Sequence, residues 1–269
     1  MNAKPSKASA PVPKAAKPYL AADFPLAIAH RGFSQVGLEN SLVAFKAASE
    51  MGFQYVETDI NATADGVATV CHDPTLGRTT DQNGIIAELP YSVVRTARIG
   101  GREPIVTLNE FFAALPTTSF NIDVKDAGSV GPLVAAIEEL GLHERVCIAS
   151  FSERRRRRVL AGLSQPVASS PGQWLLVTYF LLSPWLPNGF VRSLMRTVDV
   201  LQIPVSFKGL ALVTAAKVRR AHGLGLKVHV WTIDDPAQMH ELFDLGVDGI
   251  MTDRADILAE VMRQRGYWA

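Results

Sequence analysis

The chain of 269 residues has only two cysteines, Cys71 and Cys147, which lie far apart in predicted strands. A secreted scaffold held by disulfides carries more cysteines, in pairs. We therefore expect both to be reduced core residues of a protein in a reducing compartment, the cytoplasm. The chain also lacks an excess of charge, because 27 basic and 26 acidic residues leave a formal net charge of +1. No global field attracts nucleic acid, which we do not expect as a partner, so an anionic ligand would have to be bound locally.

Long uninterrupted apolar runs are also missing. The first 20 residues are rich in lysine, alanine and proline but have no apolar signal-peptide core. We expect residues 1–22 to be a disordered tail and residues 23–269 to be a single domain. Residues 173–195 are strongly apolar, but two prolines interrupt them and they are too short to cross a bilayer comfortably.

What the chain does contain is a regular alternation of elements. Short apolar segments typical of buried strands alternate with helical patterns, several of which end in a glycine suited to a helix C-terminus. The predicted strands are residues 26–30, 55–60, 120–125, 145–151, 166–170, 199–205, 227–233 and 247–253. Eight such units favour a closed α/β barrel, the TIM (β/α)8 fold, over an open doubly wound sheet, which would suit five or six strands.

Two segments depart from this alternation. A turn at residues 64–66 predicts a hairpin that adds a short strand beside the second one, and the loop-rich residues 73–106 are interpreted as a small insertion that follows it. Residues 173–195 follow the fifth predicted strand, so we expect them to form an apolar lid or loop at the mouth of the barrel.

Polar side chains gather near the carboxyl ends of several predicted strands. Residues two apart in a strand share a face, and active sites of such barrels form at the carboxyl ends of the strands. The polar residues in these positions are His30, Arg31, Glu57, Asp59, His72, Asp123, Lys125, His229 and Trp231. We expect the residues of the first strand, the hairpin and the third strand to surround one cavity.

Three carboxylates in one cavity need a counter-charge, because like charges repel strongly in a partly desolvated site. Oxygen ligands from Glu57, Asp59 and Asp123 favour one hard divalent cation, Mg²⁺ or Ca²⁺, although the spacing excludes neither histidine as a ligand. Arg31 and Lys125 add positive charge that suits a phosphate. Two histidines supply groups that exchange protons near neutral pH, so the set has the parts needed to cleave a phosphate ester.

Each of these residues alone also has an ordinary structural explanation. Histidines are often satisfied core residues, and carboxylates form salt-bridged layers inside barrels. We interpret His229 as a core residue, and Trp231 could equally be a packing residue. Taken together, charged groups at several strand ends are costly to bury unless they bind something.

Several stretches resemble the glycerophosphodiester phosphodiesterase family, in order and with matching spacing, over about residues 26–259. They are "AHRG", "ENSLVAF", "GFQYVETDINATADGVATVCHDPTLGRTT", "NIDVK" and "LKVHVWTIDDPAQMHELFDLGVDGIMTDRAD". The resemblance implies a TIM barrel with a small insertion after the hairpin. It also implies a metal-dependent hydrolase that releases an alcohol from a glycerophosphodiester and leaves glycerol 3-phosphate.

The resemblance also implies a role for each matching residue. His30 and His72 would be the general acid and base, while Glu57, Asp59 and Asp123 would bind the cation. Arg31 and Lys125 would contact the phosphate, and Trp231 would shape the glycerol pocket. Glu39, near the site, would orient Arg31 or touch the metal. Position 123 is usually glutamate in the family, so the shorter aspartate here leaves the identity of the metal open.

Alternative functions remain at this stage. Residues 173–195 could admit a lysophospholipid, which would make the protein a lysophospholipase D. The five arginines Arg154–Arg158 could contact an anionic membrane surface and make the protein peripheral to a membrane, although five consecutive helical residues cannot share one face. A non-catalytic phosphodiester-binding barrel is the third alternative. A sphingomyelinase D-like enzyme fits the motifs less well, and the sequence does not predict the oligomeric state.

Overall fold

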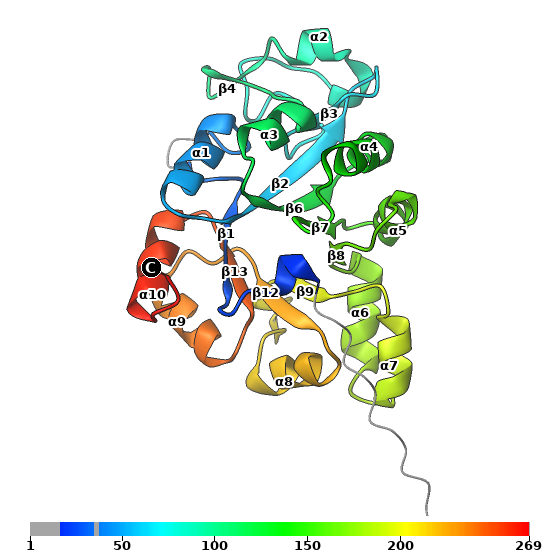
Figure 1. The fold of residues 1–269 in the computed structure, drawn as a ribbon, viewed down its shortest axis with the longest axis vertical. Helices are drawn as coiled ribbons and strands as arrows, with labels where there is room; N and C mark the ends of the chain where they lie inside the picture. The colour runs from blue at the N-terminus through cyan, green and yellow to red at the C-terminus, as the bar shows by residue number, and fades with distance from the viewer. Residues whose placement is uncertain (1–16, 35–37, 269) are drawn as a thin grey trace, which may run out of the picture.

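The protein forms a parallel barrel whose helices surround the strands (Figure 1). The computed structural model describes residues 17–34 and 38–268. The barrel strands are β1 (Leu26–His30), β2 (Tyr55–Ala62), β6 (Ser119–Val124), β7 (Val146–Ala149), β8 (Ala168–Ser169), β9 (Val200–Ile203), β12 (Lys227–Val230) and β13 (Gly249–Thr252). The predicted TIM (β/α)8 fold is confirmed, because each of the eight predicted strands overlaps one of these.

The strands pair in the order β8-β7-β6-β2-β1-β13-β12-β9. At the remaining gap, the backbone N–H of Asp199 donates to the carbonyl of Ser169 over 2.9 Å, which brings the ends of β8 and β9 together. The barrel is thus nearly closed, and its edges are short.

Helices lie around the barrel, and several of them begin at a capping side chain. They are α1 (Leu42–Glu50), α3 (Leu108–Ala114), α4 (Val130–Leu140), α5 (Glu153–Gly162), α6 (Gln173–Leu182), α7 (Asn188–Leu194), α8 (Ala215–Gly223), α9 (Pro236–Asp244) and α10 (Ala255–Gln264). Thr107 and Glu110 form a capping box at the start of α3, and Gly141 ends α4 in the left-handed conformation. A continuous apolar core fills the layer between the strands and the helices.

The amino-terminal end of the barrel is covered by η1 (Pro18–Leu20). Tyr19 and Leu20 are buried with inward-facing residues of the strands, and the ring of Tyr19 packs edge-on against Tyr55 at 5.2 Å between centroids. The predicted disordered tail of residues 1–22 is therefore wrong at residues 18–20, because the barrel needs apolar side chains to fill this end. Residues 1–16 of that predicted tail lie outside the described residues.

A small insertion with its own core follows the second strand. β3 (Ala68–Val70) pairs antiparallel with β2, as the predicted hairpin requires. The next segment holds η2 (Ile86–Glu88), α2 (Tyr91–Val94), β4 (Arg98–Ile99) and β5 (Glu103–Pro104). Apolar side chains of this segment pack with Leu38 and Cys71 in a separate cluster. Figure 1 shows the insertion at one end of the molecule, beyond α3.

Residues 173–195 form the two helices α6 and α7 rather than an irregular loop. Leu175, Tyr179 and Val191 anchor these helices to the core, while several of their other apolar side chains are exposed. After β9, the hairpin of β10 (Ser206–Phe207) and β11 (Leu210–Ala211) leads to α8. Among the described residues, no helix combines the length and the apolar character needed to cross a membrane.

Candidate active site

A cavity of about 200 Å³ lies at the carboxyl ends of the barrel strands. Eight of the nine residues proposed from the sequence line it, namely His30, Arg31, Glu57, Asp59, His72, Asp123, Lys125 and Trp231. The ninth, Glu39, lies behind the cavity wall and accepts a hydrogen bond of 3.0 Å from Arg31. The structure therefore brings the whole predicted set together.

Strand register explains why the carboxylates meet. His30 on β1 lies level with Glu57 on β2, and Asp59 on β2 lies level with Asp123 on β6. Neighbouring strands are about 4.8 Å apart, so level residues of one face become direct neighbours. Side chains up to 93 residues apart in sequence thus line one patch of the barrel mouth.

Two cations hold the aspartates. Lys125 Nζ lies 2.8 Å from Asp59 Oδ1 and 2.7 Å from Asp123 Oδ2, and Arg31 Nε lies 3.1 Å from Asp59 Oδ2. Burial alone would raise the pKa of Asp59, but the positive charges of Lys125 and Arg31 outweigh it and lower that pKa. At Asp123 the effect of burial outweighs the positive charge of Lys125, so the pKa of Asp123 is raised.

Glu57 is the least compensated carboxylate. Its side chain is buried, and Oε2 has no hydrogen-bond partner among the described residues. Burial, together with the charge of Asp59, raises the pKa of Glu57 to about 8. Asp123 Oδ1 is likewise buried and without a partner. Two buried carboxylate oxygens of the cavity therefore lack a hydrogen-bond partner among the described residues.

These oxygens suit a hard cation in their chemistry. Unpartnered carboxylate oxygens are the donors that Mg²⁺ and Ca²⁺ take in proteins. No three His, Cys, Asp or Glu side chains in the described part of the chain are already grouped to enclose an ion. The ammonium group of Lys125 forms ion pairs with both Asp59 and Asp123 and stands between them.

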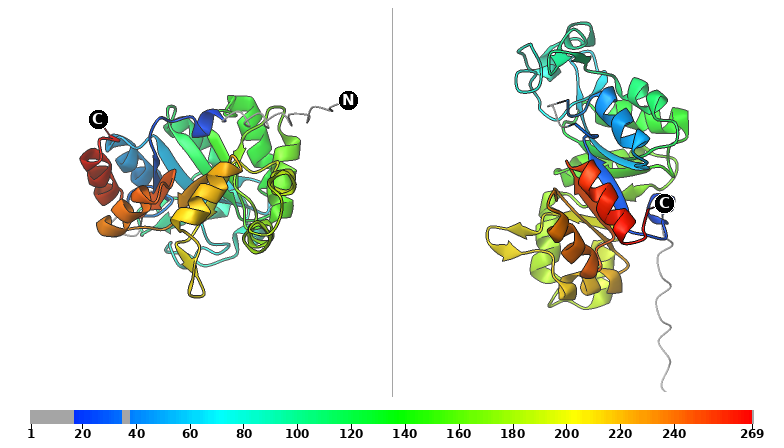
Figure 2. Two further views of the ribbon diagram at one scale, coloured as in Figure 1. Left: turned by 90° about the horizontal axis from the view of Figure 1, so that it is seen from below. Right: turned by 90° about the vertical axis from the view of Figure 1, so that its left-hand side faces the viewer.

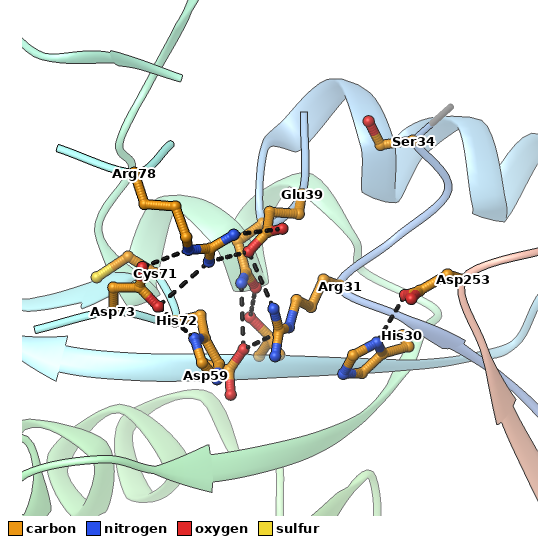
Figure 3. A network of polar contacts seen from close by, with 12 residues as sticks. His30, Arg31, Ser34, Glu39, Asp59, Cys71, His72, Asp73, Arg78 and Asp253 are labelled. Atoms are coloured by element: carbon orange, nitrogen blue, oxygen red, sulfur yellow. Dashed lines mark hydrogen bonds and ion pairs between the residues drawn. The ribbon is translucent and has the colours of Figure 1, made fainter. Parts of the chain in front are cut away.

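His30 is held by a residue that the sequence analysis missed. Its Nδ1 lies 2.7 Å from Asp253 Oδ1, just after β13 (Figure 3). Its Nε2 lies 3.6 Å from Glu57 Oε2. Burial alone would lower the pKa of His30, but Glu57 and the hydrogen bond to Asp253 outweigh it and raise that pKa. A carboxylate on Nδ1 fixes the ring so that Nε2 points into the cavity.

His72 is held in a similar way by its neighbour. Its Nδ1 lies 2.5 Å from Asp73 Oδ1, and Asp73 is also bound by Arg78. The hydrogen bond from Arg78 is the main cause that lowers the pKa of Asp73 to about 2. Arg78 also pairs with Glu39 at 2.6 Å, and Glu39 pairs with Arg31. Figure 3 shows this chain of ion pairs running from His72 to Arg31.

Unusual backbone angles place the residues after β1. Arg31 has a φ of 56° and Gly32 a φ of 84°. A Cβ atom on Gly32 would lie 2.6 Å from the carbonyl carbon of Ala44, so only glycine lets the chain pass α1 here. Left-handed angles are uncommon for bulky side chains, and here this turn brings the Arg31 guanidinium to Asp59.

Two buried asparagines, to which the sequence analysis gave no role, hold residues of the site in place. Asn40, with a φ of 59°, donates from Nδ2 to Asp59 Oδ2 over 3.2 Å and accepts from Thr58. Asn61 lies within 3.0 to 3.3 Å of the backbone carbonyls of Cys71, His72 and Asp73 and so clamps the loop that carries His72. Asn40 belongs to the "EN" motif, which was a signal, whereas nothing in the sequence singles out Asn61.

An apolar wall borders the charged floor of the cavity. Phe151 and Trp231 pack edge-on at 6.5 Å between ring centroids, and Lys125 Nζ lies 5.6 Å from the centroid of Phe151. Leu176 from α6 also lines the cavity. The start of α6 therefore lies at the mouth, as expected for residues 173–195.

The five arginines Arg154–Arg158 do not form one basic patch that could contact an anionic surface. Arg156 is completely buried, where it bonds Glu153, Ser169 and Thr197. Arg155 Nε donates to Ser150 Oγ beside the cavity over 3.1 Å. The expectation that these five residues cannot share one face is thus confirmed, because consecutive helical residues point in different directions.

The remaining sequence interpretations concern core residues. His229 is fully buried, and burial lowers its pKa to about 4, as a neutral core residue requires. Cys71 and Cys147 are buried and form no disulfide. Neither cysteine lines the cavity.

Comparison with known proteins matches this arrangement. Residues 30–257 match the model of the glycerophosphoryl diester phosphodiesterase family. A relative from Mycobacterium tuberculosis, named probable glycerophosphodiester phosphodiesterase 2, is 43% identical over 90% of this chain and 92% of its own length. A human lysophospholipase D is 26% identical over 84% of this chain and 82% of its own length.

Solved structures share the fold. The structure of a phosphodiesterase from Oleispira antarctica, in complex with the product sn-glycerol-3-phosphate, superposes with a TM-score of 0.71 at 23% identity and covers 89% of this chain and 97% of its own. This likeness shows the fold, whereas the family match and the 43% identical relative show an enzyme with glycerophosphodiester phosphodiesterase activity. The chain belongs to the glycerophosphoryl diester phosphodiesterase family.

Proposed function

We propose that this chain cleaves glycerophosphodiesters with His30 and His72 as general acid and base and with one divalent cation, Mg²⁺ or Ca²⁺, held by Glu57, Asp59 and Asp123. The observation that carries the proposal is the single cavity that all of these side chains line. The products would be an alcohol and glycerol 3-phosphate. The product bound in the Oleispira antarctica phosphodiesterase supports this assignment.

The charges of the cavity suit a phosphodiester. Arg31 and Lys125 face the carboxylates from within the cavity and would bind the non-bridging phosphoryl oxygens. A fixed cationic group stabilises the charge that develops there in the transition state without reorganisation. A bound divalent cation would add Lewis-acid stabilisation of the same oxygens. Trp231 and Phe151 would contact the carbon skeleton of the glycerol.

We assign His30 as the general acid and His72 as the general base. Asp253 and Glu57 both stabilise the protonated form of His30. The aspartate behind His72, Asp73, is shared with Arg78. His72 would then take the proton of the attacking hydroxyl while His30 protonates the leaving alcohol. Attack by water would give glycerol 3-phosphate directly, whereas attack by the substrate glycerol hydroxyl would give a cyclic phosphate that water then opens to glycerol 3-phosphate. Each such group contributes about 10² to 10⁴ in rate.

Cation dependence is tested by removing and restoring the ion. Initial rates on glycerophosphocholine are measured for protein treated with EDTA and then dialysed against buffer with Mg²⁺, Ca²⁺ or no cation. Calorimetric titration with each cation is compared between the parent protein and Glu57→Gln. We expect activity only with added cation, and weaker cation binding in the variant. Full activity after EDTA treatment, with no heat of binding, would contradict the cation part of the proposal.

A second candidate is lysophospholipase D activity. Leu176 of α6 lines the cavity, and the exposed Trp174 lies on the same first turns of α6. The human relative of that name adds support. Release of lysophosphatidate from lysophosphatidylcholine, at a rate comparable with hydrolysis of glycerophosphocholine, would establish this second substrate class. No observation favours a non-catalytic barrel.

A further inference from the structure

Charge is distributed unevenly along this chain. Residues 154–233 contain twelve lysines and arginines but one acidic residue, Asp199, although the whole chain has 27 basic and 26 acidic residues. Asp199 is buried at the foot of β9. Arg156 is buried as well, so the exposed surface built from this segment carries the other basic side chains and no carboxylate of its own.

The same segment concentrates the exposed apolar side chains. Of the fourteen large hydrophobic residues exposed in the described part of the chain, eight belong to residues 154–233. They are Trp174, Val177, Leu181, Leu182, Trp185, Phe190, Phe207 and Leu210. Trp174 is 78% exposed, Trp185 85% and Leu210 70%. Clusters of exposed aromatic and aliphatic side chains of this kind mark interaction surfaces.

The tip of the β10–β11 hairpin is the most prominent part of this surface. Phe207 and Leu210 are direct cross-strand partners, so their side chains share one face, and Lys208 and Gly209 make the turn between them. Figure 2 shows the hairpin projecting from the body on the side opposite η1. Because η1 covers the amino ends of the strands, the hairpin projects on the side of the active site.

The hairpin and α6 form one continuous surface. Lys217 of α8 donates from Nζ to the carbonyl of Ala211 at the hairpin base, and the same Nζ lies 5.6 Å from the ring centroid of Phe180 on α6. The first turn of α6 reaches the cavity through Gln173. Both views in Figure 2 place the hairpin beside α6 and α7. The exposed surface of α6, α7 and β10–β11 is called the docking face below.

We propose that the docking face binds the surface of an anionic phospholipid bilayer. Phe207, Leu210 and the exposed tryptophans would enter the interfacial layer, where amphipathic aromatic rings are favoured. Lys208 and Arg192, the basic residues of the docking face, would attract anionic headgroups. A second copy of this chain is a poorer occupant, because a symmetric contact would bring two basic surfaces together.

Docking of this kind is independent of the catalytic roles proposed above. It would hold the cavity mouth close to the lipid headgroups, since α6 joins the docking face to the cavity. No described helix could span the bilayer, so the contact is with its surface. A surface contact that combines a few apolar side chains with basic residues gives reversible binding that depends on ionic strength.

Vesicle co-sedimentation of the full chain tests the proposal. Vesicles of phosphatidylcholine alone are compared with vesicles that also contain phosphatidylglycerol, at low and high salt. We expect binding to the anionic vesicles, weaker binding at high salt, and a blue shift of tryptophan fluorescence. Phe207→Ser with Leu210→Ser should weaken binding at least about tenfold, because two apolar side chains leave the interface. Lys208→Glu should weaken it in anionic vesicles only.

A matched control pair removes the same residue types elsewhere. Phe24 and Leu140 are 52% and 50% exposed and lie outside the docking face, so Phe24→Ser with Leu140→Ser should bind vesicles like the parent. Hydrolysis of glycerophosphocholine by the hairpin variant should equal that of the parent, which shows that it is folded. Three results would overturn the proposal: no binding to anionic vesicles, equal losses in both double variants, or a dimer of the parent that the hairpin variant cannot form.

Discussion

Asp253 distinguishes the two histidines of the cavity at the scale of single residues. Both histidines have an aspartate on Nδ1, but Asp73 shares its charge with Arg78 whereas Asp253 pairs with His30 alone among the described contacts. Glu57 and Asp253 raise the pKa of His30 and so stabilise its protonated form. This difference is the basis for assigning His30 as the acid.

Replacing Asp253 with asparagine should lower kcat by about tenfold or more, a part of the 10² to 10⁴ that a general acid contributes. The carboxylate stabilises the imidazolium, so its removal lowers the pKa of His30 and moves the alkaline limb of the kcat profile to lower pH. Asp256→Asn is the matched control, because Asp256 pairs with Arg254 on the surface. A lower kcat with an unmoved alkaline limb would mean that Asp253 has only a structural role.

His229 should make stability depend on pH. Its pKa in the folded protein is about 4 because of burial, below the ordinary value of 6.5. As pH falls below 6.5, the unfolded chain takes up the proton first, so stability is lost between about pH 6.5 and 4. From pH 7 to pH 5 the loss should be about 2 kcal/mol, measured by urea unfolding. His229→Gln should reduce this slope, and an unchanged slope would assign it to other groups.

Among the secondary-structure elements, helix α5 shows that five consecutive arginines do not share one role. Arg156 is buried and joins α5 to β8 and to residue 197, whereas Arg154, Arg157 and Arg158 are exposed. The sequence predicted that five arginines could not share a face. It could not predict which one would turn inward, because this depends on how α5 packs against the barrel.

Arg156→Met should destabilise the protein by about 3–5 kcal/mol, because it leaves the polar partners of a buried ion pair without a donor. Arg158→Met is the control, and a change at this exposed position should stay within about 0.5 kcal/mol. The free energy of unfolding from denaturant titration measures both. Equal effects of the two substitutions would show that the buried position of Arg156 does not matter for stability.

The strands were the elements most accessible from the sequence. Apolar segments that alternate with helices fixed their number and order, and the period of two along β2 and β6 placed Glu57, Asp59 and Asp123 on one face. Asn61, Arg78 and Asp253 were not assigned a role, since their contacts depend on loop conformations after the strands. Loop geometry has no periodic signal, so only the folded structure brings these side chains to the histidines.

In the whole molecule, the amino-terminal end of the barrel is filled by a residue that the composition predicted to lie in a disordered tail. Tyr19 fills the amino-terminal end, and its hydroxyl has no hydrogen-bond partner among the described residues. Short segments rich in lysine and proline next to it gave no sign of this burial. A single aromatic side chain can be a core residue without any periodic pattern around it.

Tyr19→Ala should therefore cost about 3–5 kcal/mol of stability, because a large side chain leaves a cavity at the base of the barrel. Tyr19→Phe keeps the ring and removes only the unpartnered hydroxyl, so it should be neutral or slightly stabilising. Thermal unfolding of both variants separates the two effects. A loss in Tyr19→Phe as large as that in Tyr19→Ala would show that the hydroxyl, not the ring, holds the segment.

The most direct test of the whole account is phosphorus NMR of glycerophosphocholine incubated with the protein and a divalent cation, beside His30→Ala and His72→Ala. We predict a glycerol 3-phosphate resonance that grows with the parent protein, disappears with EDTA, and is slowed by about 10² or more in each histidine variant. Product formation at the parental rate by both variants would contradict the assignment of the reaction to this cavity.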